Sequence, residues 1–130
     1  MIVLDASVVV EFLGNGPLAA SLLCELAQSG ESFVVPHLLD VEVTSALRGL
    51  VAGQRIDSRR SEELLEELAL LPAERCSHVP LLGRIWELRH NFTAYDAAYL
   101  ALAEATGAVL YTFDEKLRRG HRARVVVFSR

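Results

Sequence analysis

Four acidic residues of this sequence stand where their carboxylates could act together on one substrate. Asp5 directly follows the short apolar run that begins the chain, and Asp114 follows a later apolar run after two residues. Asp96 lies in the first turn of an expected helix, and Glu42 lies about one turn into another. Clustered carboxylates are costly to bury without a cation, and Mg²⁺ prefers such oxygen ligands. Because carboxylates around one or two such ions commonly serve phosphodiester hydrolysis, we hypothesise a metal site of that kind.

Each acid also has a purely structural interpretation. Asp5 could cap a helix after the first strand, and Asp96 follows Thr93 at the spacing of a capping box. Asp114 could begin a helical turn, where its charge suits the helix dipole, and Glu42 could be an exposed helical residue. These interpretations weaken when the acids are taken together, because Asp5 and Asp96 have strongly apolar or small neighbours (IVLDASVVV and AYDAAYLALA). No set of histidines and cysteines with zinc-binding spacing competes with the acids.

The elements that must position these acids alternate between strands and helices. Apolar runs predict short buried strands over residues 1–4, 33–35, 108–111 and 125–128, and a weak third strand is expected near residues 75–79. Helical spacing predicts helices over residues 17–30 (opened by Asn15-Gly16-Pro17), 38–52, 57–71, 80–89 and 93–107, with a helical turn over 113–119. This alternation predicts a parallel sheet with helices on both faces, in which ligands sit beyond the carboxyl ends of the strands. All four acids are expected at that edge.

The composition fits one folded domain over residues 1–130, because 52% of the residues are apolar and 23% are charged. The net charge of −4 gives no sign of a nucleic-acid binder, but the charges are unevenly distributed. Residues 1–47 contain six acids and no lysine or arginine, whereas residues 116–130 contain six bases and no acid. A fold with the acids in a cleft and the bases on its rim could hold a polyanion, although a solvated basic tail explains the bases equally well.

The sequence indicates a cytoplasmic protein. No apolar run approaches the roughly 20 residues of a membrane helix, and no basic residue precedes the apolar start as in a secretory signal. Cys24 and Cys76 lack metal-binding spacing, which is typical of thiols in a reducing compartment.

Four segments make the chain similar to a known family. They are VLDASVVVEFL around Asp5, PHLLDVEVTSAL around Glu42, TAYDAAYLALAEATGAVLYT around Asp96 and YTFDEKL around Asp114. Over essentially its whole length, the chain resembles the PIN-domain nucleases, and within them the VapC-type toxins of bacterial toxin–antitoxin pairs. The third segment followed by the fourth is the most specific part of the resemblance.

The resemblance implies a fold, a metal and a reaction. The fold is a three-layer α/β/α sandwich whose five-stranded parallel sheet has the order 3-2-1-4-5. The metal is Mg²⁺ or Mn²⁺, held by Asp5, Glu42, Asp96 and Asp114. The reaction is endonucleolytic cleavage of RNA, with structured RNAs such as tRNA or ribosomal RNA as the usual targets. The resemblance also implies a homodimer and a cognate VapB-type antitoxin whose tail blocks the active site.

Further residues are expected around the four acids. Ser7 and Thr112 are candidate hydroxyl partners of the metal ligands, although ordinary turn and capping roles explain them equally well. Lys116, Arg118 and Arg119 are placed to share the phosphate charge if the turn after the fourth acid faces the cleft. Some family members carry a further acid where this chain has Lys116, so a site of four acids is expected.

We expect a water activated by the metal to attack the scissile phosphorus in line. Glu42 either binds the metal, directly or through water, or helps to remove the proton. One alternative is a phosphatase or phospho-acceptor domain, because Asp5 after a first strand also suits those enzymes. A phosphatase of the Asp-x-Asp type would have a second aspartate two residues after Asp5. This chain has Ser7 there, which counts against that alternative. A second alternative is a non-catalytic module that binds RNA or protein, although such a module gains nothing from clustered carboxylates.

The expected homodimer also has a basis in the residues themselves. The helix expected over 57–71 offers more apolar surface than one core needs. It carries Leu64, Leu65, Leu68, Leu70 and Leu71.

Overall fold

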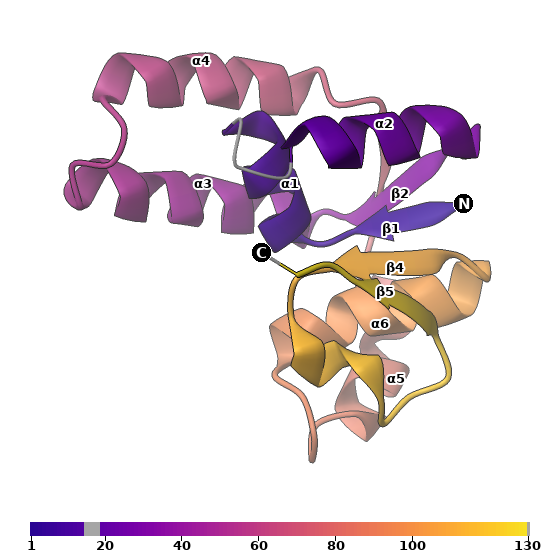
Figure 1. Ribbon diagram of the computed structural model, residues 1–130. Coiled ribbons are helices and arrows are strands. Elements are labelled where there is room, and N and C mark those ends of the chain that lie inside the picture. Colours follow the sequence, from indigo (N-terminus) through magenta and orange to yellow (C-terminus); the bar gives the residue numbers. More distant parts are fainter. Residues whose placement is uncertain (15–18, 130) are drawn as a thin grey trace.

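The computed structural model describes residues 1–14 and 19–129, with the backbone alone for residues 19–23 (Figure 1). Its strands are β1 (Ile2–Leu4), β2 (Phe33–Pro36), β3 (Ala73–Cys76), β4 (Val109–Thr112) and β5 (Arg124–Val127). Its α-helices are α1 (Ala6–Leu13), α2 (Ala19–Ser29), α3 (Leu38–Ala52), α4 (Ser58–Ala69), α5 (Leu82–Glu87) and α6 (Ala94–Thr106). Two 3₁₀ turns, η1 (Val79–Leu81) and η2 (Glu115–Arg118), precede α5 and β5. Among the described helices, none is long and apolar enough to cross a bilayer.

The strands form one parallel sheet in the order β3-β2-β1-β4-β5. In its centre, Val3 of β1 lies opposite Val34 of β2 and Leu110 of β4, and all three side chains are buried. Strands covered on both faces appear in a sequence as continuous apolar runs, which is why the sequence reveals these three. The predicted five-stranded parallel sheet and its order are confirmed.

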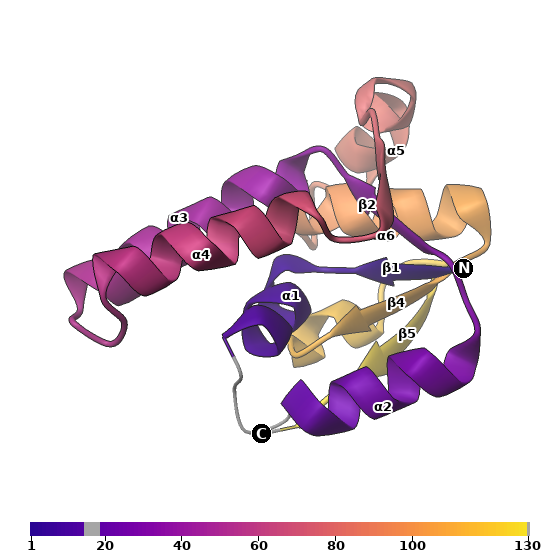
Figure 2. The same ribbon diagram turned by 90° about the horizontal axis from the view of Figure 1, so that it is seen from above.

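Helices cover both faces of the sheet, which confirms the predicted three-layer α/β/α sandwich. Helix α6 packs across β1, β2 and β4, with α5 on its outer side, whereas α1 and α2 cover the other face (Figure 2). Helices α3 and α4 form a hairpin that extends away from the sheet, with α3 packed on α1. A helix that leads into a parallel strand must return to the amino end of that strand. Helix α6 therefore begins at the carboxyl edge of the sheet.

Helix α6 is deeply embedded between the sheet and α5. Its residues from Ala97 to Ala103 are all buried, and its many alanines let it approach the strands closely. At its start, the Thr93 hydroxyl accepts a hydrogen bond from the Asp96 backbone N–H at 3.1 Å. At its end, Gly107 has a φ of 72°, which only glycine adopts without steric cost. The helix therefore holds Asp96 at a fixed depth at the sheet edge.

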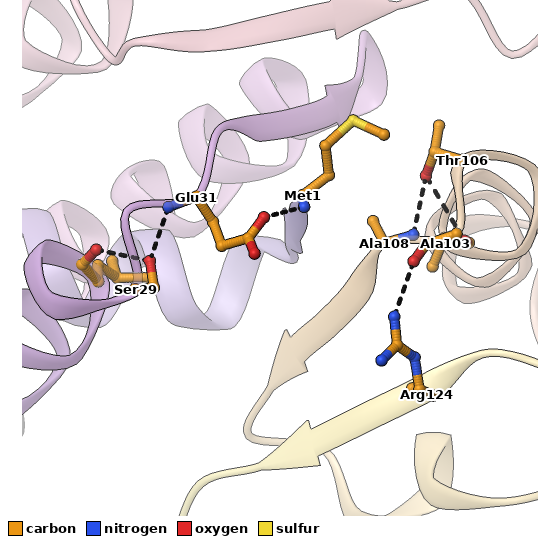
Figure 3. Close-up of polar contacts among 9 residues, drawn as sticks. Met1, Ser29, Glu31, Ala103, Thr106, Ala108 and Arg124 are labelled. Atoms are coloured by element: carbon orange, nitrogen blue, oxygen red, sulfur yellow. Dashed lines mark hydrogen bonds and ion pairs between the residues drawn. The ribbon is translucent and has the colours of Figure 1, made fainter.

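Polar contacts fasten the opposite, amino edge of the sheet (Figure 3). The Met1 ammonium group pairs with the Glu31 carboxylate. The Thr106 hydroxyl accepts a hydrogen bond from the Ala108 N–H at 3.4 Å, and Arg124 donates to a backbone carbonyl just after α6 at 3.0 Å. These contacts fix the ends of α2 and α6 at the edge where the strands begin.

The third strand is the main difference from the predicted elements. It covers Ala73–Cys76 rather than residues 75–79, because this edge strand is half-exposed and has no continuous apolar run. A 3₁₀ turn follows it, and α5 begins at Leu82 instead of at Pro80. The predicted opening of the second helix at Asn15-Gly16-Pro17 lies outside the described residues.

Candidate active site

Asp5 lies at the carboxyl end of β1, where it is 7% exposed and begins α1. Its carboxylate accepts a hydrogen bond from the Val8 backbone N–H at 3.2 Å, which caps the helix. The Ser7 hydroxyl donates to its Oδ1 at 2.6 Å, and the Thr112 hydroxyl of β4 donates to its Oδ2. Burial raises the pKa of Asp5, although these hydrogen bonds oppose the shift. The same carboxylate therefore caps a helix and contributes a buried charge to the sheet edge.

The two hydroxyls also connect Asp5 to the loop that carries Asp114. The Ser7 oxygen accepts a hydrogen bond from the Phe113 backbone N–H at 3.2 Å. The Thr112 oxygen accepts one from the Asp114 backbone N–H at 3.0 Å. Each hydroxyl thus donates to Asp5 and accepts from the loop after β4. Two acids that are far apart in the sequence are held in a fixed relation by these contacts.

Asp96 and Asp114 approach each other from α6 and η2. Asp114 begins η2, where its carboxylate accepts a hydrogen bond from the Lys116 N–H at 2.9 Å. Burial raises the pKa of Asp96, and the negative charges of Asp114 and Asp5 raise it further. The Lys116 ammonium group acts on Asp96 in the opposite sense. Lys116 therefore lies within electrostatic reach of the acids.

Glu42 lies in the second turn of α3 and is half-buried. The hydroxyl of Tyr99, a residue of α6 that is only 2% exposed, donates to Glu42 Oε1 at 2.6 Å. Burial raises the pKa of Glu42, and the charges of Asp96 and Asp5 raise it further, while the Tyr99 hydrogen bond lowers it. Burial and the Glu42 carboxylate in turn hold the pKa of Tyr99 above its ordinary value. The phenol is therefore a hydrogen-bond donor at neutral pH.

The four predicted acids are electrostatically connected at one edge of the sheet. Asp5 and Asp96 both act on Glu42, and Asp5 and Asp114 both act on Asp96. Asp5 and Asp114 follow β1 and β4, whereas Glu42 and Asp96 belong to α3 and α6, so the fold gathers the four acids from along the whole chain. Negative charges that lie close together at a partly buried sheet edge repel one another, which favours the binding of a cation.

The chemistry of these donors fits a hard divalent cation. Carboxylate and water oxygens are the ligands that Mg²⁺ and Mn²⁺ prefer, and the four acids supply no thiolate or imidazole. Within the described ranges, no group of three or more histidine, cysteine, aspartate or glutamate side chains is arranged so that it could by itself hold a metal ion. Mg²⁺ usually keeps several waters and binds proteins through one or two carboxylates. Water molecules would therefore have to complete the coordination of an ion held by these acids.

The predicted phosphate-binding residues lie on and just after η2, and all three are exposed. The positive charge of Lys116 lowers the pKa of Asp96, so Lys116 lies within electrostatic reach of that carboxyl. Arg118 instead donates to the Glu115 carboxylate at 2.6 Å, and the charge of Arg119 acts on the same carboxylate. The structure thus brings Lys116 to the acids and engages Arg118 and Arg119 with Glu115.

Comparison with known proteins identifies the family. Residues 2–122 match the PIN domain family. The chain belongs to this family. Ribonuclease VapC9 from Mycobacterium tuberculosis is 40% identical to this PIN domain over 117 residues, which cover 90% of this chain and 88% of that relative. Such identity over nearly the full length places this PIN domain among the VapC ribonucleases.

Two solved structures share the fold of this PIN domain. VapBC2 from Rickettsia felis, bound to a DNA fragment from its promoter, contains a chain with a TM-score of 0.72 and 16% identity. The match covers 97% of this chain and 98% of that one. VapC20 from Mycobacterium tuberculosis, described as a sarcin–ricin loop cleaving toxin, has a TM-score of 0.68 at 16% identity, covering 90% and 92%. At these identities the likeness shows the fold.

Sequence reasoning missed Tyr99 as a partner of the acids. Asp96 and Tyr99 are three residues apart in α6, so they share one side of the helix. A buried phenol needs a hydrogen-bond partner. A tyrosine one helical turn after a predicted ligand, among alanines and leucines, is the signal that could have identified it.

Proposed function

We propose that this PIN domain, acting as one unit over residues 1–130, is a metal-dependent endoribonuclease and the toxin of a toxin–antitoxin pair. The observation that carries the proposal is the mutual repulsion of Asp5, Glu42, Asp96 and Asp114 at one sheet edge. RNA is itself a polyanion, so an acidic edge repels it unless a cation stands between them. Metal-dependent cleavage therefore explains these acids better than RNA binding alone.

The proposed direct ligands of Mg²⁺ or Mn²⁺ are Asp5, Asp96 and Asp114, whose side chains would have to close around the ion more tightly than they lie in this structure. Glu42 binds directly or through water. When bound, the cation would supply positive charge for the phosphate oxygens and lower the pKa of a water molecule. The two hydroxyls on Asp5 restrict the rotation of its carboxylate, so its remaining lone pairs keep one direction. Glu42, whose pKa burial raises, is suited to accept the proton that the attacking water loses.

Lys116 is the proposed contact to the phosphate next to the cut. It is the only lysine in the sequence, and its charge already acts on Asp96. Arg118 and Arg119 are proposed to bind RNA further away. Arg118 would exchange its Glu115 partner for a phosphate, and an exposed ion pair of this kind costs little to break.

Structured RNA, either tRNA or ribosomal RNA, is the proposed substrate. The fold that this chain shares with VapC20, a toxin described as cleaving the sarcin–ricin loop, supports this substrate class. A cognate VapB-type antitoxin is the proposed partner, and the VapC relatives support it. The negative field of the four acids would be complemented by a basic antitoxin segment that blocks the site.

A homodimer is proposed through an apolar groove between α3, α5 and α6, with a volume of about 420 Å³. Val41, Leu82 and Tyr95 line the groove and are 68%, 52% and 60% exposed. Exposed apolar surface of this kind marks an interface, and a two-fold pair would cover the same groove on both chains. At helix α4, where the sequence suggested an interface, Leu64 and Leu68 are buried in the core, whereas Leu65 and Leu70 are exposed.

The test is the cleavage of total cellular RNA with Mg²⁺, with Mn²⁺ or with a chelator. Asp5→Asn removes the charge but keeps the side-chain size and the capping oxygen. We expect defined fragments that require both a cation and Asp5, with a loss of at least about 1000-fold, or about 4 kcal/mol, in the variant. Asp57→Asn is the matched control, because Asp57 caps α4 in the same manner away from the four acids.

If an Asp5→Asn preparation free of contaminating nuclease still cleaves RNA, the assignment of the site is wrong. Turnover of a small phosphomonoester with RNA left intact would favour the phosphatase alternative. A protein that binds RNA but neither Mg²⁺ nor Mn²⁺ would favour the non-catalytic module.

A further inference from the structure

Tyr99 makes a contact that the proposed chemistry does not by itself require. Its ring is almost completely buried in the core, yet its hydroxyl reaches the Glu42 carboxylate at 2.6 Å. The two residues are 57 positions apart in the sequence and belong to α6 and α3. A short hydrogen bond to a charged oxygen is stronger than one between neutral groups. The contact therefore joins the two helices at the acidic edge.

The rigidity of the two partners differs. Tyr99 lies within the buried run Ala97–Ala103 of α6, so its ring has a fixed position against the sheet. Glu42 has a long, half-buried side chain on α3, which would otherwise sample several rotamers. The fixed partner therefore determines where the mobile carboxylate lies.

The hydroxyl also leaves most of the carboxylate available. A carboxylate offers about four lone-pair positions on its two oxygens, and the Tyr99 hydroxyl occupies one position on Oε1. The remaining positions can face a cation or its waters. Asp96, one helical turn before Tyr99, lies close enough to act on the same Glu42 carboxylate. One helix thus supplies both an acid and the group that orients a second acid.

We propose that Tyr99 is a positioning residue that holds Glu42 at the acidic site and thereby sets the affinity of this PIN domain for divalent cations. The inference rests on the proposed function, because it takes Glu42 as part of the cation site. Groups that orient metal ligands in this way typically change metal affinity about 10- to 100-fold when they are removed.

The test compares Mn²⁺ affinity, measured calorimetrically without RNA, in the wild-type chain and in Tyr99→Phe. This substitution deletes one oxygen and keeps the ring in the core. We expect the affinity to fall about 10-fold. Tyr111→Phe is the matched control, because the Tyr111 hydroxyl donates to Glu25, a carboxylate of α2, at 3.3 Å. Its Mn²⁺ affinity is expected to equal that of the wild type.

A second comparison separates positioning from general damage to the core. Tyr99→Phe is introduced into a chain that already carries Glu42→Gln, where no further loss of Mn²⁺ affinity is expected. RNA cleavage by Tyr99→Phe should also recover at saturating Mn²⁺, because a weakened cation site is filled again by mass action.

Unchanged Mn²⁺ affinity in Tyr99→Phe overturns the inference alone, provided that the wild type binds the ion. An equal loss in the Glu42→Gln background also overturns it, because the effect would then not pass through Glu42. A wild-type chain that binds no Mn²⁺ overturns this inference together with the proposed metal site.

Discussion

Asp5 shows how one residue serves structure and chemistry together. Its carboxylate caps α1 and also receives two hydroxyl hydrogen bonds, and each of those hydroxyls accepts a backbone N–H of the loop after β4. The side chain of Thr112 is completely buried, so its hydroxyl has no access to water as a substitute partner. The carboxylate, the hydroxyls and the loop therefore form one connected unit.

Thr112→Val removes the donor to Asp5 and the acceptor for the Asp114 N–H, while the shape of the side chain is kept. We expect Mn²⁺ affinity to fall about 10- to 100-fold, because Asp5 and the loop lose their common anchor. Calorimetry measures the change. Thr44→Val is the control, since the Thr44 hydroxyl donates to the Asp40 carbonyl on the exposed side of α3. Equal affinities in the two variants would exclude a role for the Thr112 hydroxyl.

Among the elements, α6 has the largest role in placing the site. It carries Asp96 and Tyr99 near its start, and Glu104 near its end fastens it to its surroundings. Arg84 of α5 donates to the Glu104 carboxylate at 2.7 and 3.1 Å, and the Arg122 backbone N–H donates at 2.8 Å. The Glu104 side chain is 11% exposed, so this ion pair is largely shielded from water. It ties α5, α6 and the segment before β5 together.

The Arg84 hydrogen bonds hold the pKa of Glu104 below its ordinary value. A carboxyl whose pKa is lower in the folded than in the unfolded state contributes stability that is present above the unfolded pKa. That contribution is lost as the pH falls through the folded pKa. Glu104→Gln is therefore expected to lower the free energy of unfolding by about 2 kcal/mol at pH 7, with a smaller difference in acid. Urea unfolding at several pH values checks this, and a difference that grows in acid would contradict it.

The elements were predictable from the sequence where burial controls the pattern. The bounds of α3 at Leu38 and Ala52 follow from its apolar spacing and from Gly53, and the buried strands follow from their apolar runs. The expected bounds of the edge strand β3 were wrong, because a half-exposed strand has no continuous apolar run to mark it. For helix α1, the sequence indicated only that Asp5 could cap a helix there. The VVV run of α1 is as typical of a strand as of a buried helix.

The four acids could be predicted because the carboxyl edge of a parallel sheet is a known location for ligands. The sequence also indicated Ser7 and Thr112 as hydroxyl partners, and both donate to Asp5, but it did not indicate Tyr99. Whether Tyr99 reaches Glu42 depends on the distance between α6 and α3, which the sequence does not contain. The same holds for Arg118, whose pairing with Glu115 depends on the local path of η2.

For the whole molecule, we expect the acidic edge to lower the free energy of unfolding when no cation is bound. Burial raises the pKa of Asp5, Glu42 and Asp96, and the negative charges of neighbouring acids raise the pKa of Glu42 and of Asp96 further. The folded state therefore binds protons more tightly than the unfolded state, and stability falls as the pH rises through these raised values. In a chelator, Asp5→Asn should be more stable than the wild type at pH 7, by a difference that shrinks in acid.

Cation binding should reverse this order. At about 100 times its Kd, Mn²⁺ is expected to stabilise the wild type by about 2.7 kcal/mol, and Asp5→Asn by much less. Thermal unfolding with Mn²⁺ and with chelator measures both effects. Equal stabilisation of the two chains would mean that the ion binds elsewhere.

The apolar groove between α3, α5 and α6 is the proposed dimer interface, and this can be tested by substitution. Leu82→Lys puts a charge at its rim and should reduce the molar mass in light scattering from that of a dimer to that of one chain. Leu70→Lys is the control, because Leu70 lies at the end of α4 and is 81% exposed outside the groove. A wild-type chain that is monomeric at micromolar concentration would contradict the proposed dimer.

The most direct test of the central claim is Mn²⁺ calorimetry on four single variants, Asp5→Asn, Glu42→Gln, Asp96→Asn and Asp114→Asn. If the four acids form one cation site, each substitution should lower the affinity for the same ion, with the largest losses at the three aspartates. Wild-type affinity in any of the three aspartate variants would contradict a single site built by all of them.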